Sequence, residues 1–187
     1  MLLSSASRVV LDANVLFPLS LRDTLLRAAE RGVIQVHWSV EILEETRRNL
    51  VATMTITEAQ AQRLVETMKV AFPDAMVSDY MGLIADMKND EGDRHVAAAA
   101  VKCGARVIVT SNLADFRELP KGIKAMSPDD FLTNLLEADP SGMVDQLERQ
   151  AGALRRPPRS FEELLAGLGK LVPGFVRVVR EYVKAGQ

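Results

Sequence analysis

The chain has 187 residues, of which 48% are hydrophobic, and its formal net charge is −2. A chain of this length and composition can bury a full core, and it is long enough for one domain plus an appendage. The small net charge excludes a protein that attracts nucleic acid through its overall charge, so any such contact must come from a local patch.

Cysteine usage and hydropathy predict a cytoplasmic protein. The single Cys103 cannot form an intrachain disulfide, which suits a reducing compartment. The N-terminus lacks the charged and apolar segments of a signal peptide, and no apolar run approaches the roughly 20 residues of a membrane span. We therefore expect no contact with a membrane.

Short apolar runs of strand length alternate with helical patterns in the first 140 residues. The strand candidates are residues 8–11, 33–38 and 105–110, and the last of these is a β-branched run typical of a strand buried on both faces. Alternation at this spacing predicts an α/β fold in which helices sandwich a parallel sheet.

Capping residues predict where the intervening helices begin and end. Ser20 opens a helix that ends at Gly32, Ser39 caps the next helix, and Thr57 begins a long amphipathic stretch. An alanine-rich helix runs to Cys103 and is stopped by Gly104, with Asp90 as its candidate cap.

The composition changes after Pro140. Residues 141–187 show helical segments and no strand pattern, and they carry a net charge of +3 against −5 for residues 1–140. Ser160 and Glu163 form a capping-box pattern after a double proline. We predict a sheet domain over residues 1–138 and a C-terminal helical extension over residues 139–187.

Acidic and polar residues stand where the predicted strands end. Asp12 follows the first strand, and Thr110 ends a later strand that leads into Asn112 and Asp115. Because ligands of open parallel sheets bind beyond the carboxyl ends of the strands, these side chains are candidates for one site.

Further carboxylates occur on the helices that follow. Glu41, Glu44 and Glu45 lie on the helix after the second strand, and Asp90 and Asp93 lie at the start of the alanine-rich helix. Two carboxylates about 4 Å apart repel by roughly 4 kcal/mol at an effective dielectric constant near 20, so a cluster must hold protons or a cation.

The ligand types favour Mg²⁺ or Mn²⁺ over zinc. Carboxylate and amide oxygens suit hard divalent ions, and neither His37 nor His95 has a partner at zinc-site spacing. Hard ions held by acids serve phosphoryl chemistry, which points to cleavage of a phosphodiester. Structural roles remain open for some of these residues: Asp90 as a cap, Glu44 in a surface pair with Arg48, and His95 as a packed or capping histidine.

Three stretches resemble the acidic motifs of PIN domains in order and approximate spacing: LDANVLF, SVEILEETRRNL and DEGDRHVAAAAVKCGARVIVTSNLADF. The resemblance covers about residues 7–135. PIN domains are metal-dependent nucleases with a parallel sheet sandwiched by helices, and many are toxins of the VapBC type that cleave RNA and are silenced by a cognate antitoxin. The tail with LRRPPRSFEELL resembles the helical extension of one subgroup of these toxins.

The resemblance implies roles for individual residues. It makes Asp12, Glu45 and Asp93 the metal-binding catalytic acids, with Asp115 a weaker candidate. Helix geometry by itself leaves Glu41 and Glu45 on one face, so Glu45 is selected by the motif alone.

Supporting roles follow from the same motifs. Asn14 would position the loop after the first strand, and Thr110 would orient a ligand or water. Asn112 stands where many PIN domains carry an acid, which predicts a weaker second metal site and one bound ion in the free protein.

Partners also follow from the resemblance. It implies an RNA substrate, an antitoxin protein and a homodimer. Arg22, Arg94 and Lys88 lie near the proposed edge in the sequence and are candidates for steering the RNA. A denser basic group is formed by Arg155, Arg156 and Arg159.

A binding protein without catalysis is the alternative. A PIN-like fold that binds RNA or protein would also carry these motifs, and Asn112 would then mark lost activity. A haloacid-dehalogenase-like phosphatase fits less well, because it requires Asp where the chain has Asn14.

Overall fold

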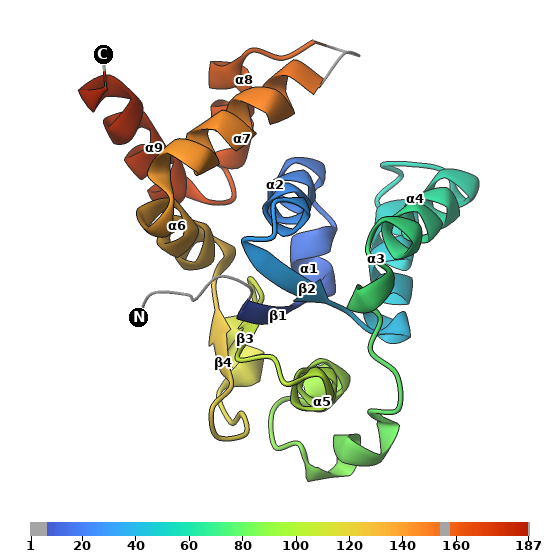
Figure 1. Cartoon of the computed structure of the whole chain (residues 1–187). Helices are drawn as coiled ribbons and strands as arrows, with labels where there is room; N and C mark the ends of the chain where they lie inside the picture. Colours follow the sequence, from blue (N-terminus) through green and yellow to red (C-terminus); the bar gives the residue numbers. More distant parts are fainter. Residues whose placement is uncertain (1–6, 154–157, 187) are drawn as a thin grey trace. The chain divides into compact units, whose positions relative to one another are not determined.

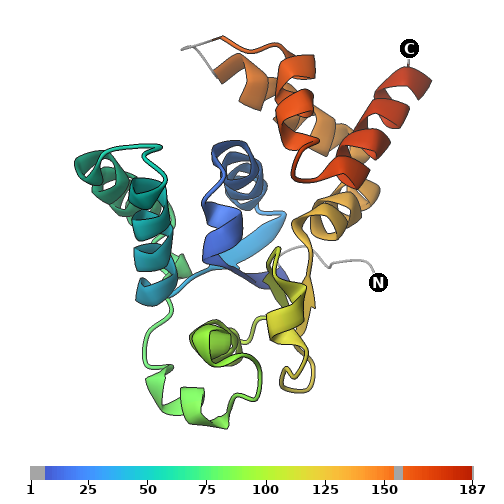
Figure 2. The same cartoon turned by 180° about the vertical axis from the view of Figure 1, so that it is seen from behind.

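The computed structural model describes residues 7–153 and 158–186 (Figures 1 and 2). The strands are β1 (Ser7–Leu11), β2 (Ile34–His37), β3 (Val107–Val109) and β4 (Lys124–Met126). The α-helices are α1 (Ala13–Leu16), α2 (Leu19–Glu30), α3 (Val40–Ala52), α4 (Glu58–Ala71), α5 (Arg94–Cys103), α6 (Pro128–Ala138), α7 (Pro140–Ala153), α8 (Phe161–Leu168) and α9 (Pro173–Ala185). Four 3₁₀ helices are described: η1 (Pro73–Ala75), η2 (Met81–Asp86), η3 (Glu91–Asp93) and η4 (Leu113–Phe116).

The described residues divide into two compact units. The sheet unit comprises Arg8–Phe17 and Gln35–Met126. The helical unit comprises Ser7, Pro18–Ile34 and the described part of Ser127–Gln187, so α2 groups with α6–α9 although it lies early in the sequence. The predicted boundary between residues 138 and 139 stays a prediction, since this division follows contacts within each unit rather than chain order.

The predicted α/β fold with a parallel sheet is confirmed. The strand order is β2-β1-β3-β4, and β3 pairs in parallel with both β1 and β4, with Val10 opposite Ile108 and Ile108 opposite Ala125. α5 lies on one face of the sheet and α1 on the other, with α3 packed against α1 (Figures 1 and 2). All three residues of β3 are buried, as expected of a strand covered on both faces.

The sheet has a strand that the sequence patterns did not predict. β4 contains Lys124 and Ala125, neither of which is buried, and has only three residues. An edge strand has one partner, here β3, and needs no continuous apolar run. The three residues of β4 therefore show no apolar run from which a strand could be predicted.

Several helix ends follow the predicted capping residues. The Ser39 hydroxyl accepts a hydrogen bond from Ile42 N at the start of α3, and Thr57 and Ser160 form capping boxes at α4 and α8. Gly32 and Gly104 follow α2 and α5 with φ angles of +72° and +69°, a conformation that glycine adopts without a Cβ clash. These predictions are confirmed.

Two predicted helix starts are wrong. α2 begins at Leu19 with Pro18 as N-cap, so Ser20 lies inside the first turn instead of opening the helix. α5 begins at Arg94, and Asp90 instead caps the short η3 helix by accepting a hydrogen bond from Gly92 N. At α2 the helix starts one residue before the polar side chain, after a proline that makes no side-chain cap, and at the alanine-rich helix a separate 3₁₀ turn lies between the capping aspartate and the first residue of α5.

Residues 141–153 and 158–186 contain no strand, in agreement with the prediction for this part of the sequence. α2 packs on α7 through buried amides: Gln146 Nε2 donates to Thr24 O at 2.9 Å, and Gln150 Nε2 donates to Ser20 O at 3.0 Å. Gln150 also accepts a hydrogen bond from the Thr24 hydroxyl at 2.9 Å. Buried polar groups with these partners fix the register between the two helices.

A carboxylate of α6 caps α9. The N-cap residue of α9 is Val172, which has no oxygen in its side chain to accept a hydrogen bond. The Asp129 carboxylate instead accepts from Gly174 N at 2.9 Å and from Phe175 N at 2.6 Å. This contact joins two helices that are distant in the sequence and satisfies two backbone donors that α9 leaves unpaired.

Asp129→Ala should lower the free energy of unfolding by about 1–2 kcal/mol, because both backbone donors lose a charged acceptor. Urea denaturation followed by circular dichroism measures the change. Asp145→Ala, at an exposed position of α7, is the matched control and should change stability by less than about 0.5 kcal/mol. Equal stability of the two variants would contradict the proposed cap.

Within the described residues, no helix is both long enough and apolar enough to cross a lipid bilayer.

Candidate active site

Two strand ends meet at the carboxyl edge of the sheet. Asp12 follows β1 and Thr110 follows β3, and Asp12 N donates to Val109 O at 3.1 Å. The Thr110 hydroxyl donates to Asp12 Oδ2 at 2.7 Å. Asp12 is 2% exposed and Thr110 is fully buried, so the pair lies beneath the surface of this edge.

Asn14 completes the contact between the two strand ends. Its Nδ2 donates to Asp12 Oδ2 at 2.6 Å and to the Thr110 hydroxyl oxygen at 2.9 Å, while its Oδ1 accepts from Ser111 N at 2.9 Å. Ala13 N donates to the other oxygen, Asp12 Oδ1, at 2.7 Å. The Asp12 carboxylate is therefore held in one orientation by three donors.

Asp93 and Asp115 belong to two further segments that are joined by their backbones. Asp90 N donates to Asp115 O at 3.0 Å, and Asp93 N donates to Asp90 O at 3.0 Å. Asn112 Nδ2 donates to the Asp115 carboxylate, and Asn112 N donates to the Thr110 hydroxyl oxygen at 3.0 Å. The loop after β3 thus connects Asp115 to the network around Asp12.

The three glutamates of α3 have different surroundings, and within the described residues Glu41 Oε2 is buried without a hydrogen-bond partner. Glu44 forms an ion pair with Arg47, with Nε to Oε2 at 2.8 Å, rather than with the Arg48 partner expected from spacing. Glu45 is half-buried, and Asp12 contributes to its electrostatic environment. The structure therefore brings the charge of Glu45 near Asp12 and turns that of Glu44 toward an arginine.

Burial raises the pKa of three acids at this edge, and neighbouring carboxylates add to the rise for two of them, Glu45 and Asp93. Burial is the main cause of the raised pKa of Asp12, opposed by the hydrogen bond from Thr110. Burial and then repulsion from Asp12 raise the pKa of Glu45. Burial, followed by repulsion from Asp12, Asp115, Glu45 and Asp90 in that order, raises the pKa of Asp93 to about 6. All these acids therefore interact electrostatically with Asp93.

His95 is a site residue whose proximity the sequence interpretation missed. Burial dominates the raised pKa of Asp12 and of Glu45, and the charge of His95 offsets part of the rise in both. Within the described residues, His95 Nδ1 is buried and has no hydrogen-bond partner. His95 lies on the first turn of α5, two residues after Asp93, and this short spacing is the signal that could have placed it near the acids.

The donors at this edge fit a hard divalent cation. Carboxylate oxygens are the ligands that Mg²⁺ and Mn²⁺ prefer, and the raised pKa values indicate negative charge that the protein leaves uncompensated. No group of three Asp, Glu, His or Cys side chains in residues 7–153 and 158–186 is already arranged to hold a metal ion. Because three donors hold the Asp12 carboxylate in place, the other acids would have to turn toward it to bind an ion.

Comparison with known families decides the assignment. A family model described as PIN domain matches residues 8–114, more than half of the chain. The chain belongs to the PIN-domain family. A second model, the VapC50 C-terminal domain, matches residues 128–181, so this PIN protein also has the predicted C-terminal extension.

A curated relative supports the same assignment. The PIN chain is 39% identical over 115 residues to "Putative ribonuclease VapC50" of Mycobacterium tuberculosis. The aligned region covers 60% of this chain and 68% of that protein. No solved structure shows significant similarity to the chain.

The basic residues predicted to steer RNA have different surroundings. Arg94, at the start of α5 in the PIN site, is half-buried, and its Nε donates to Asn89 O at 3.2 Å. Arg22 lies on α2 in the helical unit, where it is 6% exposed and burial lowers its pKa. Their roles stay predictions. Arg155 and Arg156 lie outside the described residues.

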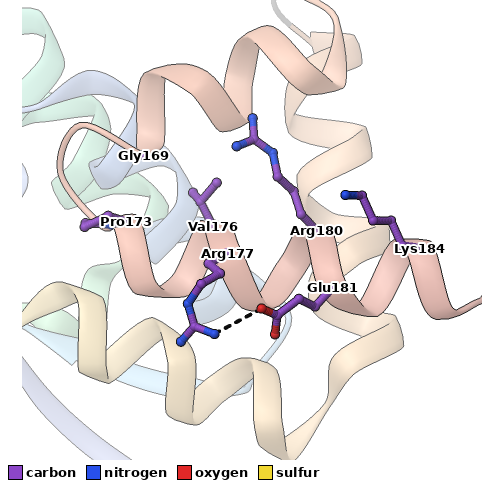
Figure 3. A pocket seen from close by; sticks show the side chains of 7 residues that line it. All are labelled: Gly169, Pro173, Val176, Arg177, Arg180, Glu181 and Lys184. Atoms are coloured by element: carbon purple, nitrogen blue, oxygen red, sulfur yellow. Dashed lines mark hydrogen bonds and ion pairs between the residues drawn. The ribbon is translucent and has the colours of Figure 1, made fainter.

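The helical unit has a separate hollow of about 350 Å³ beside α9 (Figure 3). Three cations line it, Arg177, Arg180 and Lys184. Arg177 Nη1 pairs with Glu181 at 3.0 Å, and Arg180 Nη2 pairs with Glu162 at 2.9 Å. Because two of the three cations are compensated by acids, this hollow carries little net charge, and we assign no ligand to it.

Asp93→Asn should make the metal-free protein more stable at neutral pH. Unfolding lowers the Asp93 pKa from about 6 to its ordinary value of 3.8, so the wild type loses stability as the pH rises from about 4 to about 6. The amide removes this loss. Allowing for solvent screening of a half-buried carboxylate, we expect a gain of about 1 kcal/mol at pH 7 that disappears below about pH 4.

Urea denaturation in the presence of a chelator, repeated across this pH range, measures the difference. Asp145→Asn is the control, because this exposed aspartate lies in the helical unit. An Asp93→Asn variant less stable than the wild type at neutral pH would show that the negative charge of Asp93 stabilises the fold.

Proposed function

We propose that the chain is a Mg²⁺- or Mn²⁺-dependent endoribonuclease and the toxin of a VapBC-type toxin–antitoxin pair. The observation that carries the proposal is the set of mutually repelling carboxylates around Asp93 at the carboxyl edge of a PIN-family sheet. The name of its Mycobacterium tuberculosis relative and the matching VapC50 C-terminal domain support the same activity.

Asp12, Glu45 and Asp93 are the proposed metal-binding catalytic acids, and Asp115 is a weaker fourth candidate. Their charges interact across three segments of the sheet unit, at the ends of β1 and η3 and on α3. When bound, a divalent cation supplies the Lewis acidity for attack by water on the phosphodiester and stabilises the departing oxygen.

Asn14 and Thr110 act as positioning residues in this proposal. Both donate to Asp12 Oδ2, and Ala13 N holds Oδ1, so the Asp12 carboxylate needs little rearrangement during the reaction. Asn112 orients Asp115 through its side-chain amide. A carboxylate held in place by buried donors loses less conformational entropy when it binds an ion.

Arg94 is the proposed contact to the RNA backbone in the sheet unit. Its Nε donates a hydrogen bond to Asn89 O, which restricts the direction of the guanidinium. Phosphate contacts of this kind raise affinity without reading the base sequence. Arg22 remains a further candidate on α2.

The remaining partners follow from the VapC-type assignment. We expect a cognate antitoxin protein that silences the nuclease, a homodimer and a cytoplasmic location. The alternative is a module that keeps the PIN fold and binds RNA or protein without cleaving it, in which case Asn112 would mark the lost activity.

Cleavage of a mixture of tRNA and rRNA by purified protein tests the proposal. The protein must be folded and free of antitoxin, and Mg²⁺, Mn²⁺ and chelator are compared. We expect cleavage that requires metal and falls at least about a hundredfold in Asp12→Asn, because the buried acid contributes charge to the metal site. Binding of RNA without cleavage in either metal would favour the alternative module.

One metal ion should bind to the protein in the absence of RNA. The amide of Asn112 replaces a carboxylate with a neutral oxygen donor, and its Nδ2 is already bonded to Asp115, which weakens a second site. Calorimetric titration with Mn²⁺ should give one site, lost in Asp12→Asn, with Asp145→Asn unchanged as control. Two tightly bound ions would overturn this expectation.

A further inference from the structure

A hollow of about 580 Å³ lies in the sheet unit beside α5. Its apolar lining includes Leu83 of η2, Val101 of α5 and Leu119 of the segment before β4, together with Met87, which is 6% exposed. The volume falls within the range of small-molecule sites, and apolar walls with a few polar groups are typical of such sites. A polarisable methionine sulfur also suits contact with an aromatic ring.

The polar groups of the hollow are one cation and two carboxylates. Asp86, Lys88 and Glu118 line it and are exposed. None of the three side chains has a hydrogen bond or ion pair with another residue that the structure describes. One ammonium donor and two carboxylate acceptors are thus available to a ligand at the mouth of an apolar hollow.

Residues that line the hollow are close in the sequence to acids of the candidate active site. Lys88 and Glu118 lie two residues before Asp90 and three residues after Asp115. Asp90 N donates to Asp115 O at 3.0 Å. This hydrogen bond joins the segment that contains Lys88 to the segment that contains Glu118. Because three residues of extended chain span at most about 10 Å, the mouth of the hollow is close to the acids of the site.

We propose that this hollow binds a guanine base of the substrate RNA, from a nucleotide close to the cleaved bond. The inference rests on the proposed function, since it assumes that RNA reaches the carboxylates. Single-stranded RNA is recognised by bases that leave the stack, contact apolar or aromatic side chains and form hydrogen bonds through their edges.

Guanine matches the three polar groups better than the other bases. Its N1–H and N2–H₂ are adjacent donors that one carboxylate accepts together, and its O6 accepts from an ammonium group. Adenine presents an acceptor at N1, which a carboxylate repels. Uracil and cytosine lack the adjacent pair of donors. Asp86 or Glu118 therefore accepts from N1 and N2, and Lys88 donates to O6.

Oligonucleotides that differ at one base test the proposal. A randomised single-stranded library first locates the cleavage positions of the wild-type protein with Mg²⁺. Guanine close to the cleaved bond is then replaced by inosine, which lacks the N2 amino group, or by adenine. We expect kcat/KM to fall about tenfold with inosine, because a charged acceptor loses one donor, and further with adenine.

The double variant Asp86→Asn/Glu118→Gln should reduce the preference for guanine over inosine to about twofold or less. Lys88→Gln should reduce the preference for guanine over adenine. Asp145→Asn/Glu148→Gln, two exposed positions of α7, is the matched control and should keep both preferences. No base preference in the wild type, or an unchanged preference in the double variant, would overturn the guanine site.

Binding measured in a chelator separates failure of this proposal from failure of the nuclease. Fluorescence anisotropy with the same labelled oligonucleotides reports affinity when no cleavage is possible. A guanine preference that the double variant loses supports the guanine site even if the protein never cleaves RNA. Cleavage together with equal affinity for all bases supports the nuclease but overturns the guanine site. Binding to none of the oligonucleotides also overturns the guanine site.

Discussion

Repulsion among carboxylates at the carboxyl edge of the sheet is the constraint on which the rest of the sheet unit depends. Asp93 lies in the field of Asp12, Glu45, Asp115 and Asp90, and burial and these charges raise its pKa to about 6. Folding this chain therefore assembles negative charge at a cost in free energy. Such a cost persists where function requires it, and here a divalent cation would offset it.

Hydrogen bonds at the ends of β1 and β3 hold part of this charge in a fixed position. Asp12 is buried yet accepts hydrogen bonds from Ala13, Asn14 and Thr110, so neither of its oxygens lacks a donor. Buried hydrogen-bonded networks give a single geometry, whereas a half-satisfied network would be more costly than an apolar core. The packed strands β1 and β3 provide the fixed distance between Asp12 and Thr110 that this network needs.

The helical unit is organised by long-range polar contacts in the same way. Gln146 and Gln150 of α7 bind the backbone of α2, and Asp129 of α6 caps α9. Each contact supplies a partner for a polar group that its own helix leaves unpaired. As a result, α2 belongs to the same compact unit as the C-terminal helices although it lies between β1 and β2 in the sequence.

The sequence by itself determined the fold class, the caps at Ser39, Thr57 and Ser160, and the placing of Asp12 at a strand end, because apolar periodicity and capping act over a few residues. Helix geometry did not distinguish Glu41 from Glu45, no pattern predicted β4, and a structural role remained open for His95. Only the tertiary structure decided that the charge of Glu45 interacts with Asp12, that His95 lies near both, and that Asp129 caps α9. These outcomes depend on which segments pack together, and neighbours distant in the sequence leave no local periodic signal.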